Sequence, residues 1–228
     1  MDVEQNNSEE KRLKILGEDE IEDIYGRPRF TQEERYNYFS LSQPEIELLQ
    51  ILRSVKSKIY FVLQLGYFKV KHLFFIFEPR EVLEDFKYIL NLHFEGSNEP
   101  NILDMIPLTK ITRLKHQKLI LQLFNYRSCD TKERQNLEKK VFAAVSVCCK
   151  PIYIFREIIN YLSEQRIVTP GYTYLQETVG KSITYEQKRL MSMVNNHLNY
   201  SGLIVKTRKS NFLMNLISYI FHNSYAAC

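Results

Sequence analysis

The stretch RSVKSKIYFVLQLGYFKVKHLFFIF, residues 53–77, decides the fold of this chain. Read as a helix from about Lys56, its apolar side chains recur at i, i+3 and i+4 spacing and fill most of the circumference. Gln64 is the only polar side chain left in the interior, and the pattern gives it no functional role. Because a helix that is apolar nearly all round is normally buried, the stretch predicts the central helix of a helical bundle.

Basic side chains gather at the two ends of this predicted helix. No Asp or Glu occurs between Leu48 and Phe77. The Lys and Arg residues of that interval are Arg53, Lys56, Lys58, Lys69 and Lys71. They are either the solvated lysines of an ordinary core helix or contacts for an anionic partner, and the spacing alone favours neither interpretation.

The composition of the whole chain favours a helical protein with a real core. Apolar residues make up 44% of the 228 residues and aromatic residues 13%, while Gly and Pro number only 7 each. The polar first dozen residues lack the apolar stretch of a secretory signal. No run approaches the roughly 18 apolar residues of a membrane-spanning helix. We therefore expect an all-α cytoplasmic protein without a membrane partner.

The charge is divided unevenly along the chain. Residues 1–34 carry 11 acidic residues against 5 Lys and Arg, so the remainder holds 26 Lys and Arg against 16 acidic residues. Such an excess suits a polyanionic partner such as nucleic acid, and it also suits an ordinary basic protein.

Capping signatures divide the first hundred residues into short helices. Thr31 and Ser42 are each followed three residues later by Glu, which is the capping-box spacing. Ser54 caps the central helix, and Pro79 marks the start of a further one. The predicted helices cover about 18–25, 32–39, 43–52, 56–70 and 79–92.

The stretch GSNEPN, residues 96–101, is the best candidate for a linker because it combines Gly, Ser, Asn and Pro without an apolar residue. We place a subdomain boundary near 96–108. The chain is thus predicted to form two consecutive helical bundles. Its parts are a mobile acidic arm (1–17), a first subdomain (18–100) and a second subdomain (101–228).

The second half is again predicted to be helical. Its predicted helices cover about 109–124, 130–149, 151–166, 172–181 and 184–199. The second and the last of them are predicted to begin at the capping residues Asp130 and Thr184. In the first of them, one face carries Ile111, Leu114, Lys118 and Leu121, with Lys115 and His116 beside them.

Residues 152–180 have the outline of a helix-turn-helix unit, with Pro170 and Gly171 in the turn between two helices. In such a unit, side chains at the start of the second helix reach base edges. Here those side chains are Tyr172, Thr173, Tyr174 and Gln176. The alternative is an ordinary helical hairpin, which these residues favour when no family resemblance is considered.

The chain lacks the motifs of common catalytic and cofactor sites. No phosphate-binding glycine loop, nucleophile elbow or zinc-protease motif occurs. The four cysteines and five histidines do not have the spacing of zinc ligands, and we expect reduced thiols. We therefore predict no enzyme active site, no metal and no cofactor in this chain.

Four stretches resemble, in the same order, the N-terminal region of large replicative transposases of the Tn-three type. They are IYGRPRFTQEERYNYFSLSQPEIELL (24–49), SKIYFVLQLGYFKV (57–70), Thr112–Arg113 with His116, and EQRIVTPGYTYLQETVG (164–180). The residues from about Lys206 onward do not match the family pattern.

The resemblance implies helical subdomains that bind the terminal inverted repeats of a transposon as double-stranded DNA, in the nucleoid of a bacterium. It also implies that the catalytic acidic triad of such a transposase lies beyond the end of this sequence. The residues expected to contact phosphates are Arg53, Lys56, Lys58, Lys69, Lys71, Arg113, Lys115, His116 and Lys118. The base contacts are expected from Tyr172, Thr173, Tyr174 and Gln176.

Two alternatives stay open. In the first, the chain is a non-catalytic helical interaction protein that, as a truncated transposase, pairs with full-length transposase and inhibits it. In the second, the chain is an inactive transposase remnant. The apolar composition of the tail from about Lys206 favours a remnant, because we expect such a tail to expose surface that a native domain would cover.

Overall fold

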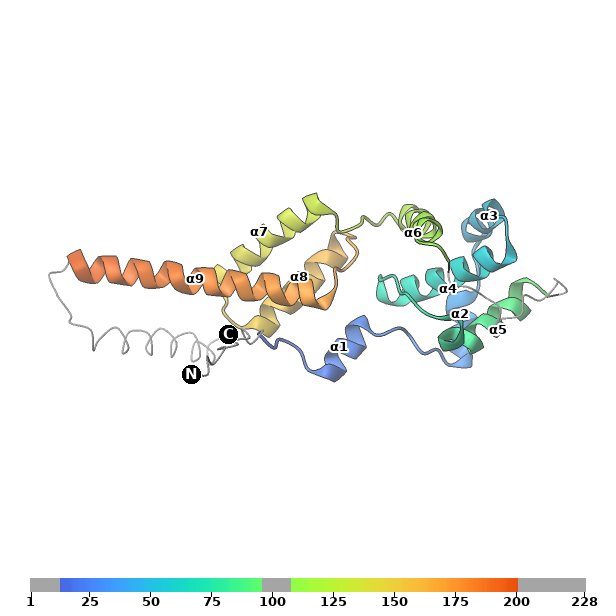
Figure 1. The fold of residues 1–228 in the computed structure, drawn as a ribbon, viewed down its shortest axis with the longest axis horizontal. Helices are drawn as coiled ribbons and strands as arrows, with labels where there is room; N and C mark the ends of the chain where they lie inside the picture. Colours follow the sequence, from blue (N-terminus) through green and yellow to red (C-terminus); the bar gives the residue numbers. More distant parts are fainter. Residues whose placement is uncertain (1–12, 96–107, 201–228) are drawn as a thin grey trace, which may run out of the picture. The chain divides into compact units, whose positions relative to one another are not determined.

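The computed structural model describes residues 13–95 and 108–200, with the side chains of 197–200 left out. Within these ranges the chain forms nine α-helices, one 3-10 turn and no β-strand, which confirms the all-α prediction (Figure 1). The elements are α1 (Glu18–Tyr25), α2 (Gln32–Phe39), α3 (Gln43–Ile51), α4 (Val55–Lys71), η1 (Pro79–Val82), α5 (Leu83–His93), α6 (Lys110–Phe124), α7 (Thr131–Val147), α8 (Pro151–Glu164) and α9 (Tyr172–Tyr200).

The predicted capping residues start the helices as expected. The Thr31 hydroxyl accepts a hydrogen bond from the Glu34 amide at 3.3 Å, and the Glu34 carboxylate accepts one from the Thr31 amide at 2.8 Å. Ser54 accepts from the first turn of α4 and Asp130 from the first turn of α7. Each cap satisfies a backbone donor that has no partner within its helix.

The described chain packs as two compact units that do not follow each other in sequence. The α4 unit comprises, among the described residues, 18–95, 108–129 and 163–169. The α7 unit comprises, among the described residues, 13–17, 130–162 and 170–200. This division differs from the predicted subdomains 18–100 and 101–228, because α6 packs with α3 and α4. The predicted linker 96–101 and the tail from about 206 lie outside the described residues.

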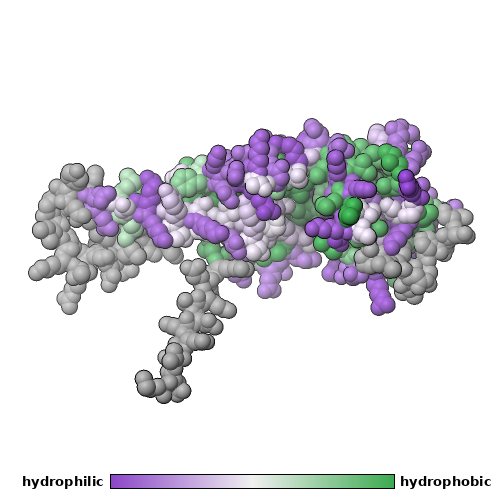
Figure 2. Space-filling model, turned by 45° about the horizontal axis from the view of Figure 1, so that its top comes forward, coloured by the Kyte–Doolittle hydropathy of each residue, from purple (hydrophilic) through white to green (hydrophobic). Residues whose placement is uncertain are grey.

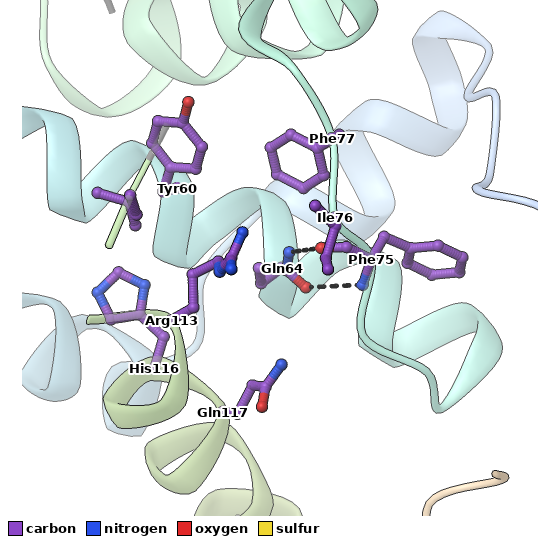
Figure 3. A pocket seen from close by; sticks show the side chains of 9 residues that line it. Tyr60, Gln64, Phe75, Ile76, Phe77, Arg113, His116 and Gln117 are labelled. Carbon is purple, nitrogen blue, oxygen red and sulfur yellow. Dashed lines mark hydrogen bonds between the residues drawn. The ribbon is translucent and has the colours of Figure 1, made fainter. Parts of the chain in front are cut away.

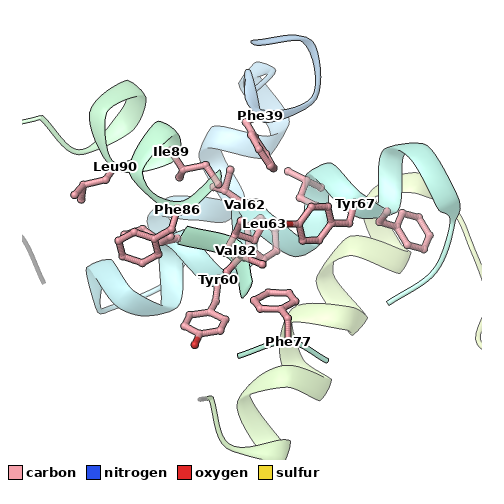
Figure 4. Close-up of a cluster of buried hydrophobic side chains, with 14 of the residues drawn as sticks. Phe39, Tyr60, Val62, Leu63, Tyr67, Phe77, Val82, Phe86, Ile89 and Leu90 are labelled. Carbon is pink, nitrogen blue, oxygen red and sulfur yellow. The ribbon is translucent and has the colours of Figure 1, made fainter. Parts of the chain in front are cut away.

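Helix α4 is the centre of the α4 unit (Figure 4). All ten residues from Ile59 to Phe68 are buried. Around them pack α2, α5 and α6, whose side chains Phe39, Phe86 and Ile120 are at most 2% exposed. The prediction of a central buried helix is thus confirmed, and its core consists mainly of aromatic and aliphatic side chains.

Gln64 has a structural role that the helical pattern does not predict. Its side-chain amide nitrogen donates to the Phe75 carbonyl, and its oxygen accepts from the Phe75 amide at 3.3 Å (Figure 3). The two bonds hold the extended segment after α4 against the helix. They also satisfy a buried polar side chain that would otherwise be costly to desolvate.

The segment 163–169 belongs to the α4 unit through backbone hydrogen bonds with Arg127. The Arg127 amide donates to the Arg166 carbonyl at 2.8 Å, and the Val168 amide donates to the Arg127 carbonyl at 2.9 Å. Ile167 is 2% exposed, and Val168 packs against the core around α4.

The α7 unit has a core of its own, built by α7, α8 and α9. Val141, Phe155, Ile158 and Leu175 are completely buried there. Lys140 of α7 and Glu157 of α8 form an ion pair of 2.9 Å at its surface.

Two sequence-based predictions for the α7 unit are corrected by the structure. Residues 13–16, predicted to belong to a mobile arm, pack on α9, with Ile15 and Leu16 buried. The arm's residues 1–12 lie outside the described part. The helices predicted over 172–181 and 184–199 form one helix, since Thr184 donates to the Gly180 carbonyl inside α9 and caps nothing.

Within the described ranges, no helix combines the length and the apolar character needed to span a membrane.

Candidate nucleic-acid interface

An open groove of about 790 Å³ lies in the α4 unit between α6 and the start of α4. Three cationic side chains line it: Arg53, Lys115 and Lys118. No acidic residue is among the described residues that line it. The remaining lining residues are Ile51, Leu52, Ser54, Ser57, Leu108, Thr112, His116, Leu119 and Gln122.

The three cations of the groove are available for a ligand. Arg53, Lys115 and Lys118 are exposed, and none forms an ion pair with a residue in the described part of the chain. The groove therefore gathers positive charge beside hydroxyl groups, which is the chemistry of a phosphate-binding surface.

The helix ends beside the groove are basic where helices usually favour acidic residues. The first turns of α4 and α6 contain no Asp or Glu, and they carry Lys56, Lys58, Lys110 and Arg113. Positive charge near the positive end of a helix dipole is unfavourable by about 0.3–1 kcal/mol per group. An anion bound in the groove would be attracted both by the helix dipoles and by these side chains.

His116 belongs to the core beneath the groove. Its ring is 1% exposed, its Nε2 lies 2.9 Å from the Ser57 hydroxyl in a hydrogen bond, and its face meets the edge of Phe61. Burial lowers the pKa of His116 to about 4, so the ring is neutral at pH 7. In this position His116 joins α6 to α4 and presents no charge to a phosphate.

A small cavity of about 20 Å³ lies behind His116, with room for one water molecule (Figure 3). Tyr60, Gln64 and Arg113 line it together with His116. The structure thus directs Arg113 toward this cavity rather than into the groove.

Lys56 and Lys58 lie on the first turn of α4 next to the groove but do not line it. Both are half-exposed, and neither forms an ion pair with a described residue. They add positive potential around the groove.

Lys69 and Lys71, at the other end of α4, are engaged within the protein. Lys69 forms a 2.9 Å ion pair with Glu45, which is 4% exposed, and donates to the carbonyls of Tyr38 and Ser40. Lys71 donates to the Asp23 carbonyl. The structure therefore brings the candidate phosphate contacts together only at the first end of α4.

Three of the four candidate base contacts on α9 hold parts of the α7 unit together. The Tyr172 hydroxyl accepts from the amides of Ile15 and Leu16 at 3.4 and 3.2 Å. The Gln176 amide donates to the Leu13 carbonyl at 2.9 Å.

Tyr174 is also engaged, because its hydroxyl donates to Glu138 at 3.3 Å and the Arg134 guanidinium lies 4.9 Å from its ring centroid. Thr173 is exposed. Among the four candidates, Thr173 is thus the one whose side chain forms no hydrogen bond within the described part of the chain.

A second group of arginines surrounds Asp85, a residue that the sequence patterns do not single out. Asp85 is 4% exposed and accepts from Arg35 at 2.7 Å and from the Tyr67 hydroxyl at 2.6 Å, while Arg27 lies 3.8 Å away. Burial, together with the Asp85 carboxylate, raises the pKa of Tyr67 well above its ordinary range. The network ties α2, α4 and α5 together, so these arginines are structural.

No group of three or more His, Cys, Asp or Glu residues in the described ranges could hold a metal ion.

Comparison with known proteins identifies a family but no activity. The model of a family described as a domain of unknown function, DUF4158, matches residues 15–182. The chain belongs to this family. A search of curated proteins gives no match.

Proposed function

We propose that this chain binds double-stranded DNA at the terminal inverted repeats of a transposon, as the N-terminal part of a transposase, and that its own residues carry no catalysis. The observation that carries DNA binding is the acid-free groove lined by Arg53, Lys115 and Lys118. The resemblance of residues 24–49, 57–70 and 164–180 to Tn-three-type transposases supplies the terminal repeat as the target.

In this proposal the groove holds the phosphate backbone. Arg53, Lys115 and Lys118 neutralise phosphates, and the hydroxyls of Ser54 and Thr112 donate hydrogen bonds to them. Each neutralised phosphate releases condensed counterions, so duplex affinity falls roughly tenfold or more between about 50 and 200 mM salt.

The buried polar contacts keep the groove in shape. The hydrogen bond between Ser57 and His116 fixes α6 against the start of α4. The Lys69–Glu45 ion pair fixes α3 against the end of the same helix. Both contacts position the cations without touching DNA.

The direct test is duplex binding by fluorescence anisotropy, with a duplex from the end of the transposon that carries the gene and a scrambled duplex. We expect tighter binding to the terminal duplex and a several-fold loss for Lys115→Gln. Lys87→Gln is the matched control, since Lys87 is an exposed lysine of α5 outside the groove. Absence of duplex binding, or equal losses for both variants, would overturn the proposal.

A second candidate function, binding of a partner protein, is favoured by a different feature. A groove of about 530 Å³ between α7 and α9 is lined by Phe142, Tyr174 and Tyr185, with Glu138 and Glu177 at its edge. Phe142 and Tyr185 are 40% and 58% exposed, and their ring centroids lie 5.3 Å apart. Exposed aromatic pairs of this kind are enriched at protein interfaces.

The partner that this alternative names is full-length transposase. Co-purification of full-length transposase that is lost in Phe142→Ala, with no duplex binding by the chain alone, would favour the alternative over DNA binding. Duplex binding without a partner would favour the DNA proposal.

A further inference from the structure

The exposed face of helix α6 combines large aliphatic side chains with cationic ones. Ile111, Leu114, Lys115, Lys118 and Gln122 are all exposed, and at about 100° per residue they fall within an arc of about 100° on one side of the helix. The opposite side carries the buried His116 and Ile120.

Two large aliphatic side chains of this face are open to solvent. Ile111 is 69% exposed and Leu114 is 53% exposed. Apolar side chains reach the surface elsewhere too, as the green regions of Figure 2 show. On α6, however, they alternate with cations, and residues 110–124 contain four Lys or Arg residues and no acidic residue.

This combination of aliphatic, amide and cationic side chains suits the major groove of DNA, which has base edges at its bottom and phosphates along both sides. The major groove, about 12 Å wide, admits one α-helix, and α6 with 15 residues is about 22 Å long. Aliphatic side chains contact the methyl group of thymine, and Gln makes a bidentate pair with adenine. Lys115 and Lys118 lie among these side chains on the same face and can reach the phosphates beside the groove.

We infer that α6 enters the major groove of duplex DNA, and that Ile111, Leu114 and Gln122 contact base edges. This inference rests on the proposed function, and it moves base recognition from the start of α9 to α6. The charge of this face of α6 is complementary to that of DNA, because Arg53 adds a third cation beside Lys115 and Lys118. We therefore take DNA as its partner. The α9 candidates Tyr172, Tyr174 and Gln176 are instead held by contacts within the α7 unit.

The test is selection from a random-sequence duplex library with the full chain and its variants. We expect Leu114→Ala and Gln122→Ala each to lose preference at one or two base pairs, by about fivefold or more per contact. Because both residues are uncharged, the salt dependence of duplex binding should stay unchanged. Thr173→Ala is the matched control, an exposed residue at the start of α9, and should select the same sequence as the wild type.

A second measurement is made first on the wild type, so its main result does not depend on the folding of a variant. In the duplex selected by the wild type, each thymine is replaced by uracil, which removes only the methyl group. We expect the wild type to lose several-fold affinity at a contacted thymine and Leu114→Ala to show no such loss there.

The outcomes separate the two proposals. Duplex binding without any base preference, or a preference altered by Thr173→Ala and not by the α6 variants, would overturn the inference and leave DNA binding intact. Absence of duplex binding by the wild type would overturn both.

Discussion

Gly66 lets α2 and α4 touch in the core of the α4 unit. A Cβ atom at this position would lie 2.5 Å from the ring of Phe39, and that ring is completely buried. We predict that Gly66→Ala lowers the free energy of unfolding by about 1–3 kcal/mol, because the ring has no space to move. Urea denaturation measures the change.

Gly180 is the matched control for this prediction, since it also lies inside a helix. A Cβ atom there would lie 3.8 Å from Leu13, an ordinary contact distance. Gly180→Ala should therefore raise the free energy of unfolding by up to about 1 kcal/mol through helix propensity. Equal effects of the two substitutions would contradict the close approach at Gly66.

His116 should make stability depend on pH. Burial lowers its pKa from 6.5 to about 4 in the folded state, so the unfolded chain binds one more proton between these values. Stability is therefore complete above about pH 6.5 and falls as the pH drops toward 4, by on the order of 3 kcal/mol for this residue.

The measurement is the difference in unfolding free energy between the wild type and His116→Gln at several pH values. Other groups titrate equally in both proteins, so the difference isolates His116. A difference that stays constant between pH 4 and 6.5 would contradict a buried neutral ring.

Single residues show where sequence reasoning stops. The helical period identifies α4 as buried, but it cannot show that Gln64 bonds the backbone of Phe75, because that partner depends on the path of the chain after the helix. Likewise, nothing local marks Asp85 as the partner of Arg27 and Arg35, which are about fifty residues away in sequence.

At the scale of elements, the two ends of α4 have different roles. Lys69 neutralises the buried Glu45. We predict that Lys69→Met lowers the free energy of unfolding by about 3 kcal/mol, since it removes the cationic partner of a buried carboxylate. Lys115→Gln should leave stability almost unchanged and weaken duplex binding. Thermal unfolding measures the stability of each variant, and fluorescence anisotropy measures its duplex binding. A stability loss for Lys115→Gln, or unchanged stability for Lys69→Met, would contradict these roles.

The start of α9 fixes the segment before α1. We predict that Tyr172→Phe accelerates hydrogen exchange at the amides of Ile15 and Leu16 by about tenfold. A change of this size corresponds to the free energy of roughly one hydrogen bond. Amides of α7 should keep their protection. Unchanged exchange at Ile15 and Leu16 would contradict the role given to the Tyr172 hydroxyl.

Helix positions were predictable from the sequence where caps mark them. Thr31, Ser42, Ser54, Thr109 and Asp130 each precede a helix in the structure, and only Thr184 lies inside one. The orientation of α6 was not predictable, because Ile111 and Leu114 share a face that the amphipathic pattern would bury. Instead, the buried face of α6 is the one that carries His116, whose Nε2 forms a hydrogen bond with the Ser57 hydroxyl.

At the scale of the whole molecule, the two units explain why the subdomain boundary differs from its prediction. Gly and Pro mark a linker near 96–101, yet α6, which follows it, packs with the helices that precede it. The groove exists only because of this packing, since Arg53 comes from before the boundary and Lys115 and Lys118 come from after it.

The measurement that tests the central claim most directly is the salt dependence of duplex affinity. It compares the wild type with the triple variant Arg53→Gln/Lys115→Gln/Lys118→Gln. If the groove holds phosphates, log affinity falls linearly with log salt for the wild type, and the slope of the variant is shallower by about three. Equal slopes for a folded variant and the wild type would contradict the claim that this groove binds DNA.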